Sequence, residues 1–211
     1  MAHRDREPSM TVTDVLGLVA SAVFIARLTP QPVRLARSGV AEGVSPLSAL
    51  NAVIAAVAWL VYGLVADLPI VWIVSLLAIL PGVWAVLLLR RHTVLADVLW
   101  ASAWVGVIVA AAAAGLLAAA LGLGVVVTQG PQVWRACRDH DLSGLSPVTW
   151  WLSILDALTW GAYGIAVGDP ALIGYAAVLS TSAVVVLSRL WWVARARNAA
   201  QAAAASQTAP T

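Results

Sequence analysis

Seven apolar stretches, each about 20 residues long, occupy most of the sequence. They cover approximately residues 11–33, 46–66, 69–89, 94–113, 116–136, 147–167 and 171–190. About 20 apolar residues are needed for a helix to cross the hydrocarbon core of a bilayer, so each stretch has the length of a membrane span. Only 10% of the 211 residues are charged and 62% are hydrophobic, whereas soluble domains carry about 25% charged residues. The sequence therefore predicts an all-α integral membrane protein with seven transmembrane helices in a lipid bilayer.

Arginines follow every second apolar stretch. After the first, third, fifth and seventh stretches lie Arg34, Arg37, Arg90, Arg91, Arg135, Arg138, Arg189, Arg195 and Arg197. The other connections carry only Asp67 and Asp169, or no charge. Because positive residues accumulate in short cytoplasmic loops, this alternation predicts a multi-pass cell-membrane protein with its N-terminus outside and its C-terminus in the cytoplasm. It also requires an odd number of spans, which favours seven over the six that the alanine-rich boundary at 110–120 would allow.

The two ends of the chain differ from the apolar stretches in composition. Residues 1–10 contain the charge-balanced run Arg4-Asp5-Arg6-Glu7, which predicts a mobile head and favours an uncleaved first span over a secretory signal. The alanine-rich end of the chain, residues 193–211, predicts a disordered cytoplasmic tail.

The sequence matches itself at a fixed offset of 101 residues, with 12 identities in the 40 positions from Pro30 to Pro69. The identical pairs are Pro30-Gln31 with Pro131-Gln132, Arg34 with Arg135, Arg37 with Arg138, Gly43 with Gly144, Ser45-Pro46 with Ser146-Pro147, Ala56 with Ala157, Trp59 with Trp160, Tyr62-Gly63 with Tyr163-Gly164, and Pro69 with Pro170. Shared hydrophobicity does not produce such a set, so it indicates an internal duplication. Four spans separate the two starts, so both copies enter the membrane in the same direction. The sequence predicts a 3+1+3 parallel repeat, with triple-helix bundles over 11–89 and 114–192 and a linker helix over 90–113.

Three motifs of this duplication resemble those of the PQ-loop superfamily, and within it the SWEET-like (MtN3/saliva-type) seven-helix sugar transporters of bacterial type. They are PQ-x-x-R at Pro30 and Pro131, G-[VL]-S-P at Gly43 and Gly144, and W-x-x-Y-G at Trp59 and Trp160. The resemblance covers nearly all of residues 11–190. It implies alternating access to a sugar site, with prolines in the first two helices of each half as hinges and the paired tryptophans stacking on the sugar ring.

Proline chemistry bears on the expected hinges. The candidate hinge residues are Pro30, Gln31, Pro46, Pro131, Gln132 and Pro147. Inside a helix, the proline of each PQ pair removes a backbone donor and clashes with the carbonyl four residues earlier, which predicts a bend. In lipid the freed carbonyl needs a partner, which the adjacent glutamine amide or a water molecule can supply. The proline of each SP pair has two interpretations, a hinge or the first residue of a helix, where proline is favoured.

Trp59 and Trp160 each lie 13 residues after an SP proline, about 20 Å along a helix. They have two interpretations. They belong to the interfacial aromatic belt, which also suits Tyr62 and Tyr163, or they face one cavity from the two halves, as the resemblance implies.

The sequence departs from the sugar transporters that it resembles at one feature of the site. In those transporters an asparagine in the third helix of each bundle contacts the substrate. The matching positions here hold Ser75 or Leu76 in the first half and Ala176 or Ala177 in the second. Other candidates to hydrogen-bond a solute are Asn51, Ser75 and Tyr175.

Arg27 and Asp156 lie near the expected midplane of the bilayer. A charge there costs at least about 2.5 kcal/mol, so it normally faces a cavity or a partner. The duplication does not repeat them, because Arg27 matches Thr128 and Asp156 matches Ala55. One hypothesis is that they line the solute pathway, either as an ion pair that breaks during the transport cycle or separately, with Arg27 receiving an anionic group and Asp156 a proton. Alternatively they form a permanent ion pair, or Asp156 bonds a neighbouring hydroxyl such as that of Thr159.

Together these features predict a transporter and not an enzyme. The first choice of solute is a mono- or disaccharide; a second is an amino acid or another small charged solute with proton coupling. A membrane receptor or assembly factor without transport is the alternative of another class. The run from Cys137 to Asp141 lacks convergent partners for a metal or catalytic site. We therefore expect no metal, cofactor or nucleic-acid partner. A monomer is sufficient for a complete pathway, and a homo-oligomer is possible.

Overall fold

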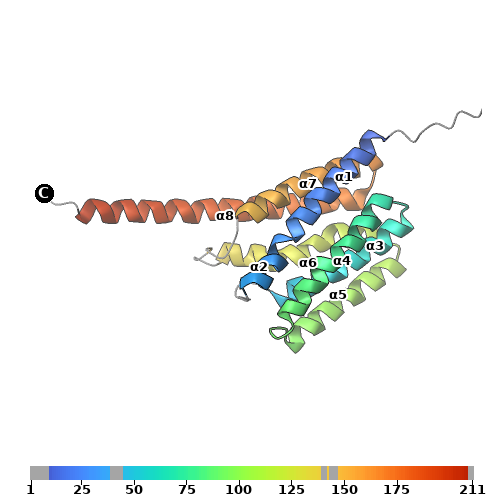
Figure 1. Cartoon of the computed structure of the whole chain (residues 1–211), viewed down its shortest axis with the longest axis horizontal. Coiled ribbons are helices and arrows are strands. Elements are labelled where there is room, and N and C mark those ends of the chain that lie inside the picture. The colour runs from blue at the N-terminus through green and yellow to red at the C-terminus, as the bar shows by residue number, and fades with distance from the viewer. Residues whose placement is uncertain (1–9, 39–44, 139–141, 143–146, 209–211) are drawn as a thin grey trace, which may run out of the picture.

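The computed structural model describes residues 10–38, 45–138, 142 and 147–208, which form eight helices and no strands (Figure 1). The helices are α1 (Val12–Leu28), α2 (Pro30–Ser38), α3 (Pro46–Val65), α4 (Pro69–Leu89), α5 (Leu95–Ala113), α6 (Leu117–Arg138), α7 (Pro147–Val167) and α8 (Pro170–Thr208). The predicted all-α class is confirmed. Each apolar stretch of the sequence corresponds to one helix, except the first, which is divided between α1 and α2.

Several of these helices are long and apolar enough to cross a membrane, which is consistent with a multi-pass membrane protein. Within the described residues these segments are Val12–Arg37, Pro46–Val65, Pro69–Leu89, Leu95–Ala113 and Pro170–Ala199. In α6 the described residues include a shorter apolar helical segment, Leu117–Gly130. Helix α7 is less apolar because it carries polar side chains such as Ser153 and Asp156, and both of these are buried. The count of seven spans stays a prediction.

The helix break at Thr29 separates α1 from α2. The Thr29 backbone N–H donates to the carbonyl of Ile25 at 3.1 Å, whereas Pro30 has no N–H to continue the ladder to Ala26. The side-chain hydroxyl of Thr29 also donates to Ile25, at 2.7 Å. In contrast, α6 runs without a break through position 131. The two PQ prolines, identical in sequence, therefore have different effects on the backbone.

Pro46 and Pro147 each begin a helix, α3 and α7. Before Pro46, the hydroxyl of Ser45 accepts a hydrogen bond from the backbone N–H of Ser48 at 3.3 Å, which caps α3. Proline is favoured at such a position because its missing N–H has no helical partner there. Of the two interpretations of the SP prolines, the structure shows the helix-start position; a hinge role stays a prediction.

The helices pack in two groups of three. Helices α1 and α3 pack on α4, and α6 and α7 pack on α8. The groups meet along two seams, where α1 lies against α7 and α3 lies against α6. Helix α5 packs on α3 and α6, and so covers the second seam. Figure 1 shows α5 at the edge of the molecule, far from the α1/α7 seam.

The turn after the W-x-x-Y-G motif has the same backbone form in both halves. Leu68 N–H donates to the carbonyl of Gly63, and Asp169 N–H donates to that of Gly164, each at 2.8 Å. Asp67 and Gly168 occupy the left-handed region at the same point of each turn, with φ of 53° and 72°. A shared motif thus produces a shared turn. The glycine of the motif, Gly63 or Gly164, lets the next helix approach closely.

The alanine-rich end of the chain differs from the prediction. Residues 193–208 continue α8 as a helix, which extends beyond the other helices (Figure 1), although their composition predicted disorder. Alanine has the highest helix propensity of all residues, so this stretch propagates a helix already started by α8.

The Gly63→Ala substitution tests the close approach of α3 and α4. A Cβ at this position would lie 2.7 Å from the backbone nitrogen of Trp72, which cannot move without shifting α4. We expect the free energy of unfolding in detergent micelles to fall by about 1–3 kcal/mol.

Gly106→Ala is the matched control, because the space around Gly106 on α5 is open within 4 Å. Its unfolding midpoint should stay the same or rise, since alanine is favoured over glycine inside a helix. Equal midpoints for the two variants would contradict the packing argument.

Candidate functional site

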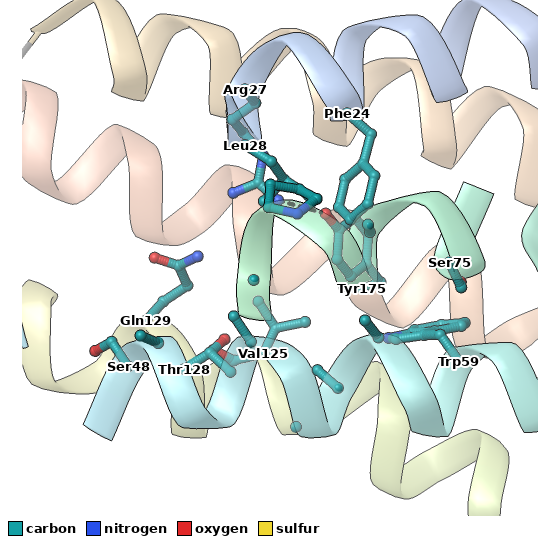
Figure 2. A pocket seen from close by; sticks show the side chains of 18 of the residues that line it. Phe24, Arg27, Leu28, Ser48, Trp59, Ser75, Val125, Thr128, Gln129 and Tyr175 are labelled. Carbon is teal, nitrogen blue, oxygen red and sulfur yellow. Dashed lines mark hydrogen bonds between the residues drawn. The ribbon is translucent and has the colours of Figure 1, made fainter. Parts of the chain in front are cut away.

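A cavity of about 280 Å³ lies between the two groups of helices. All the helices contribute to its wall, α5 through Trp104 and Ile108. A single water needs only about 10–15 Å³ of such volume, so the cavity has room for a larger solute. Its polar lining consists of Arg27, Ser45, Ser48, Ser75, Thr128, Gln129, Thr149, Ser153 and Tyr175. Figure 2 shows several of these side chains around the open space.

Aromatic side chains form one end of the cavity. Trp59 from α3 and Trp160 from α7 both belong to its wall. The ring of Trp59 contacts that of Tyr175 edge-on, with centroids 5.9 Å apart, and Trp160 contacts Phe24 in the same way at 6.4 Å. The structure thus has the paired tryptophans at one cavity, although their stacking on a sugar stays a prediction.

Arg27, Asp156 and Tyr175 form a hydrogen-bonded cluster across the α1/α7 seam. Nε of Arg27 lies 3.1 Å from Oδ2 of Asp156. An Nη atom of Arg27 donates to the Tyr175 hydroxyl at 3.1 Å. This hydroxyl in turn donates to the same Asp156 oxygen at 2.6 Å. Figure 2 shows Arg27 and Tyr175. Of the sequence alternatives for the two charges, the ion pair is the one found.

The two members of this ion pair differ in access to the cavity. Arg27 belongs to the cavity wall and its side chain is 13% exposed, whereas that of Asp156 is 0% exposed and lies behind it. Thr159 does not bond the Asp156 carboxylate; its hydroxyl donates to the backbone carbonyls of Leu155 and Asp156. The carboxylate is thus held by Arg27 and Tyr175.

Of the other residues expected in the solute pathway, some line the cavity and some do not. Ser75 is buried and reaches the cavity wall. Asn51 is also buried, but it lies outside the cavity lining, and its Oδ1 has no hydrogen-bond partner in the described structure. Leu76 and Ala177 are exposed, and Ala176 is buried. The side chains of Gln31 and Gln132 lie outside the described part of the chain.

A hydrogen bond between Tyr62 and Asp169 joins the two groups of helices beyond the aromatic end of the cavity. The Tyr62 hydroxyl, at the end of α3, donates to Oδ2 of Asp169 at 2.6 Å. The other carboxylate oxygen caps α8 by accepting from Leu172 N–H at 2.9 Å. Its sequence position near a helix end predicted a place for Tyr62 in the aromatic belt. An acidic residue directly before a helix-starting proline was the available signal for the cap, but no local pattern indicates the contact across 107 positions.

Trp104 and Trp150 also line the cavity, although no sequence motif indicated them. Trp104 belongs to α5, outside the duplicated segments, and packs on Gly124 of α6, where a Cβ would lie 2.8 Å from its ring. Gly122, on the same helix, also packs closely, against Ala171 of α8.

No cluster of three or more His, Cys, Asp or Glu side chains that could hold a metal occurs among the described residues. Cys137 is exposed at the end of α6, and residues 139–141 lie outside the described part.

The chain matches no known protein-family model and no curated protein sequence.

The ion pair predicts an unequal effect of its two single neutral variants on stability. Arg27→Gln leaves the fully buried Asp156 carboxylate without its cation, which we expect to lower the free energy of unfolding by about 3–5 kcal/mol. Asp156→Asn should cost less, because Arg27 reaches the cavity and can be hydrated there.

The double variant Arg27→Gln/Asp156→Asn contains no unpaired charge. We expect it to unfold at a higher temperature than Arg27→Gln in a detergent thermal melt. Strictly additive losses would show that the two side chains do not interact.

Proposed function

We propose that this chain is a SWEET-like membrane transporter of the PQ-loop superfamily that moves a small polar solute by alternating access. The observation that carries the proposal is the cavity, whose wall has side chains from both groups of helices and ends at Trp59 and Trp160, which belong to one packed hydrophobic cluster. Duplicated halves facing one central site are typical of secondary transporters. The sequence repeat at an offset of 101 residues supports a 3+1+3 architecture with α5 as the linker helix.

The closed end of the cavity lies toward the connections that carry no arginine. Trp59 and Trp160 are at this end, and Tyr62 bonds Asp169 beyond them. At the other end the lining reaches Ser45 and Gln129, toward the helix ends and the turn that hold the arginines. In the orientation expected from the arginines, the cavity therefore faces the cytoplasm and is shut toward the outside.

Opening toward the outside requires the two groups of helices to separate at the closed end. The contacts that must break are the Tyr62–Asp169 hydrogen bond and the aromatic contacts between the groups, such as that of Trp59 with Tyr175. The break between α1 and α2 at Thr29 supplies a point where the backbone can bend without losing helical hydrogen bonds. This supports Pro30 as a hinge.

A mono- or disaccharide is the first choice of solute. Aromatic rings at the closed end offer stacking surfaces, and serine, threonine and glutamine side chains along the wall offer hydrogen bonds to hydroxyl groups. A charged solute with proton coupling is the second choice, because a guanidinium group lies in the wall of the cavity.

Solute flux into liposomes containing the purified chain tests the proposal. Radiolabelled glucose, sucrose and arginine should enter at different rates, with a sugar fastest under the first choice and arginine driven by a pH gradient under the second. Absence of flux for all solutes would favour a receptor or assembly factor.

Two tryptophan substitutions control this flux assay. Ala52→Trp places an indole in the cavity, whose wall includes Ala52, and should abolish most of the flux. Ala103→Trp adds the same bulk to the exposed surface of α5 and should leave flux unchanged. Equal flux in both variants would argue against passage through this cavity.

The Tyr62→Phe substitution tests the closed end. Removing the hydroxyl deletes a hydrogen bond to a carboxylate, worth about 1.5 kcal/mol, or about tenfold in the ratio of closed to open states. The measurement uses a Cys137→Ser, Ser75→Cys background, in which the cysteine introduced at position 75 of the cavity wall is the only thiol. A membrane-impermeant maleimide added from the outside should label this thiol about ten times faster in the Tyr62→Phe variant.

The matched control is Tyr163→Phe, at the equivalent position of the second half. Tyr163 is buried against Trp160, with ring centroids 5.7 Å apart, and its ring stays in place in this variant. Its labelling rate should equal that of the background; an equal increase in both variants would show that the Tyr62 hydroxyl does not hold the end closed.

A further inference from the structure

Among the described residues that line the cavity, Arg27 is the only one with a formally charged side chain. An isolated cation in an apolar cavity would attract anions and repel cations. Arg27 is not isolated, because the Asp156 carboxylate lies 3.1 Å from its Nε. The charge that a solute meets therefore depends on a residue that the solute cannot reach.

The hydrogen-bond donors of Arg27 are divided between the buried Asp156–Tyr175 side and the cavity. Its Nε faces Asp156, and one Nη atom donates to the Tyr175 hydroxyl. A guanidinium group has five N–H donors, so further donors remain for groups in the cavity. Asp156 and Tyr175 are linked by their own hydrogen bond of 2.6 Å, which fixes the carboxylate behind the guanidinium. The cluster offers hydrogen bonds to a solute and carries no net charge.

We propose that the Arg27–Asp156 pair sets the charge selectivity of the cavity, so that it accepts uncharged solutes rich in acceptor oxygens and rejects anions. Arg27 donates hydrogen bonds to hydroxyl or carbonyl oxygens of the solute, and Asp156 cancels its charge from behind. An anionic solute would lose its hydration without gaining a net opposite charge. Asp156 is thus a specificity-determining residue that never contacts the solute. The inference deepens the proposed function and rests on it.

Arg27 has no counterpart in the second half that could alter this balance. The positions that match Arg27, Asp156 and Tyr175 at the offset of 101 are Thr128, Ala55 and Val74, and all three are uncharged residues of the cavity wall. The nearest aromatic neighbour of the guanidinium is Phe24, whose ring centroid is 5.4 Å from its central carbon.

Quenching of tryptophan fluorescence measures the charge of the cavity without any transported solute. Trp59, Trp104, Trp150 and Trp160 belong to the wall, so quenchers that enter the cavity reduce their emission. The measured quantity is the quenching constant of iodide, an anion, divided by that of acrylamide, which is neutral. Asp156→Asn should raise this ratio, because one uncompensated positive charge about 6 Å away concentrates an anion roughly threefold even at the dielectric constant of water.

Two variants control the quenching experiment. Asp67→Asn changes the net charge of the chain equally, but Asp67 is exposed in the turn between α3 and α4, so the ratio should stay near the wild-type value. Arg27→Gln/Asp156→Asn removes both charges and should return the ratio to the wild-type value. An unchanged ratio in Asp156→Asn, or an equal rise in Asp67→Asn, would overturn the inference.

A flux measurement on the unmodified chain tests the same selectivity if Asp156→Asn does not fold. Glucose and glucuronate have similar rings and differ in one carboxylate, and the wild-type chain should move glucose at least about ten times faster, given the cost of burying an uncompensated ion. Comparable entry of glucuronate would overturn the inference and leave the proposed transport intact. Absence of flux for both would instead contradict the proposed function.

Discussion

A carboxylate with no exposed surface, placed among apolar helices, must be compensated at contact distance. Asp156 of α7 meets this requirement through Arg27 of α1 and Tyr175 of α8. Because water cannot replace either partner there, the compensation also fixes the relative positions of these three helices. The cavity borders this cluster directly, so the same contact that holds the groups of helices together defines the chemistry of one wall.

The two seams between the groups have different characters. Along the α1/α7 seam the contact includes an ion pair, whereas the α3/α6 seam has small and uncharged residues such as Ala55 and Thr128 at the matching positions. The second seam is covered by α5, whose Trp104 rests on Gly124. Separation of the groups therefore encounters electrostatic resistance on one side and mainly packing resistance on the other.

The sequence predicted the helices well, because about 20 apolar residues between turn signals leave the chain one stable form in lipid. It also predicted that Arg27 and Asp156 lie inside the protein, since unpaired charges are excluded from lipid. It did not decide that they pair, nor did it find the contact of Tyr62 with Asp169, because both depend on the distance between helices far apart in the chain. The prediction of a disordered tail was wrong for residues 193–208, where alanine propensity prolonged α8. Identical prolines at positions 30 and 131 behaved differently, because the bend depends on neighbours that the dipeptide does not specify.

Arg27 and Asp156 belong to different copies of the sequence repeat, which places Thr128 and Ala55 at the matching positions. A symmetric pair of first copies would bring two arginines and no carboxylate to the shared space, and a symmetric pair of second copies would bring two carboxylates and no cation. Like charges would repel in either case. The ion pair therefore depends on the difference between the two copies, which a symmetric pair of either copy would lack.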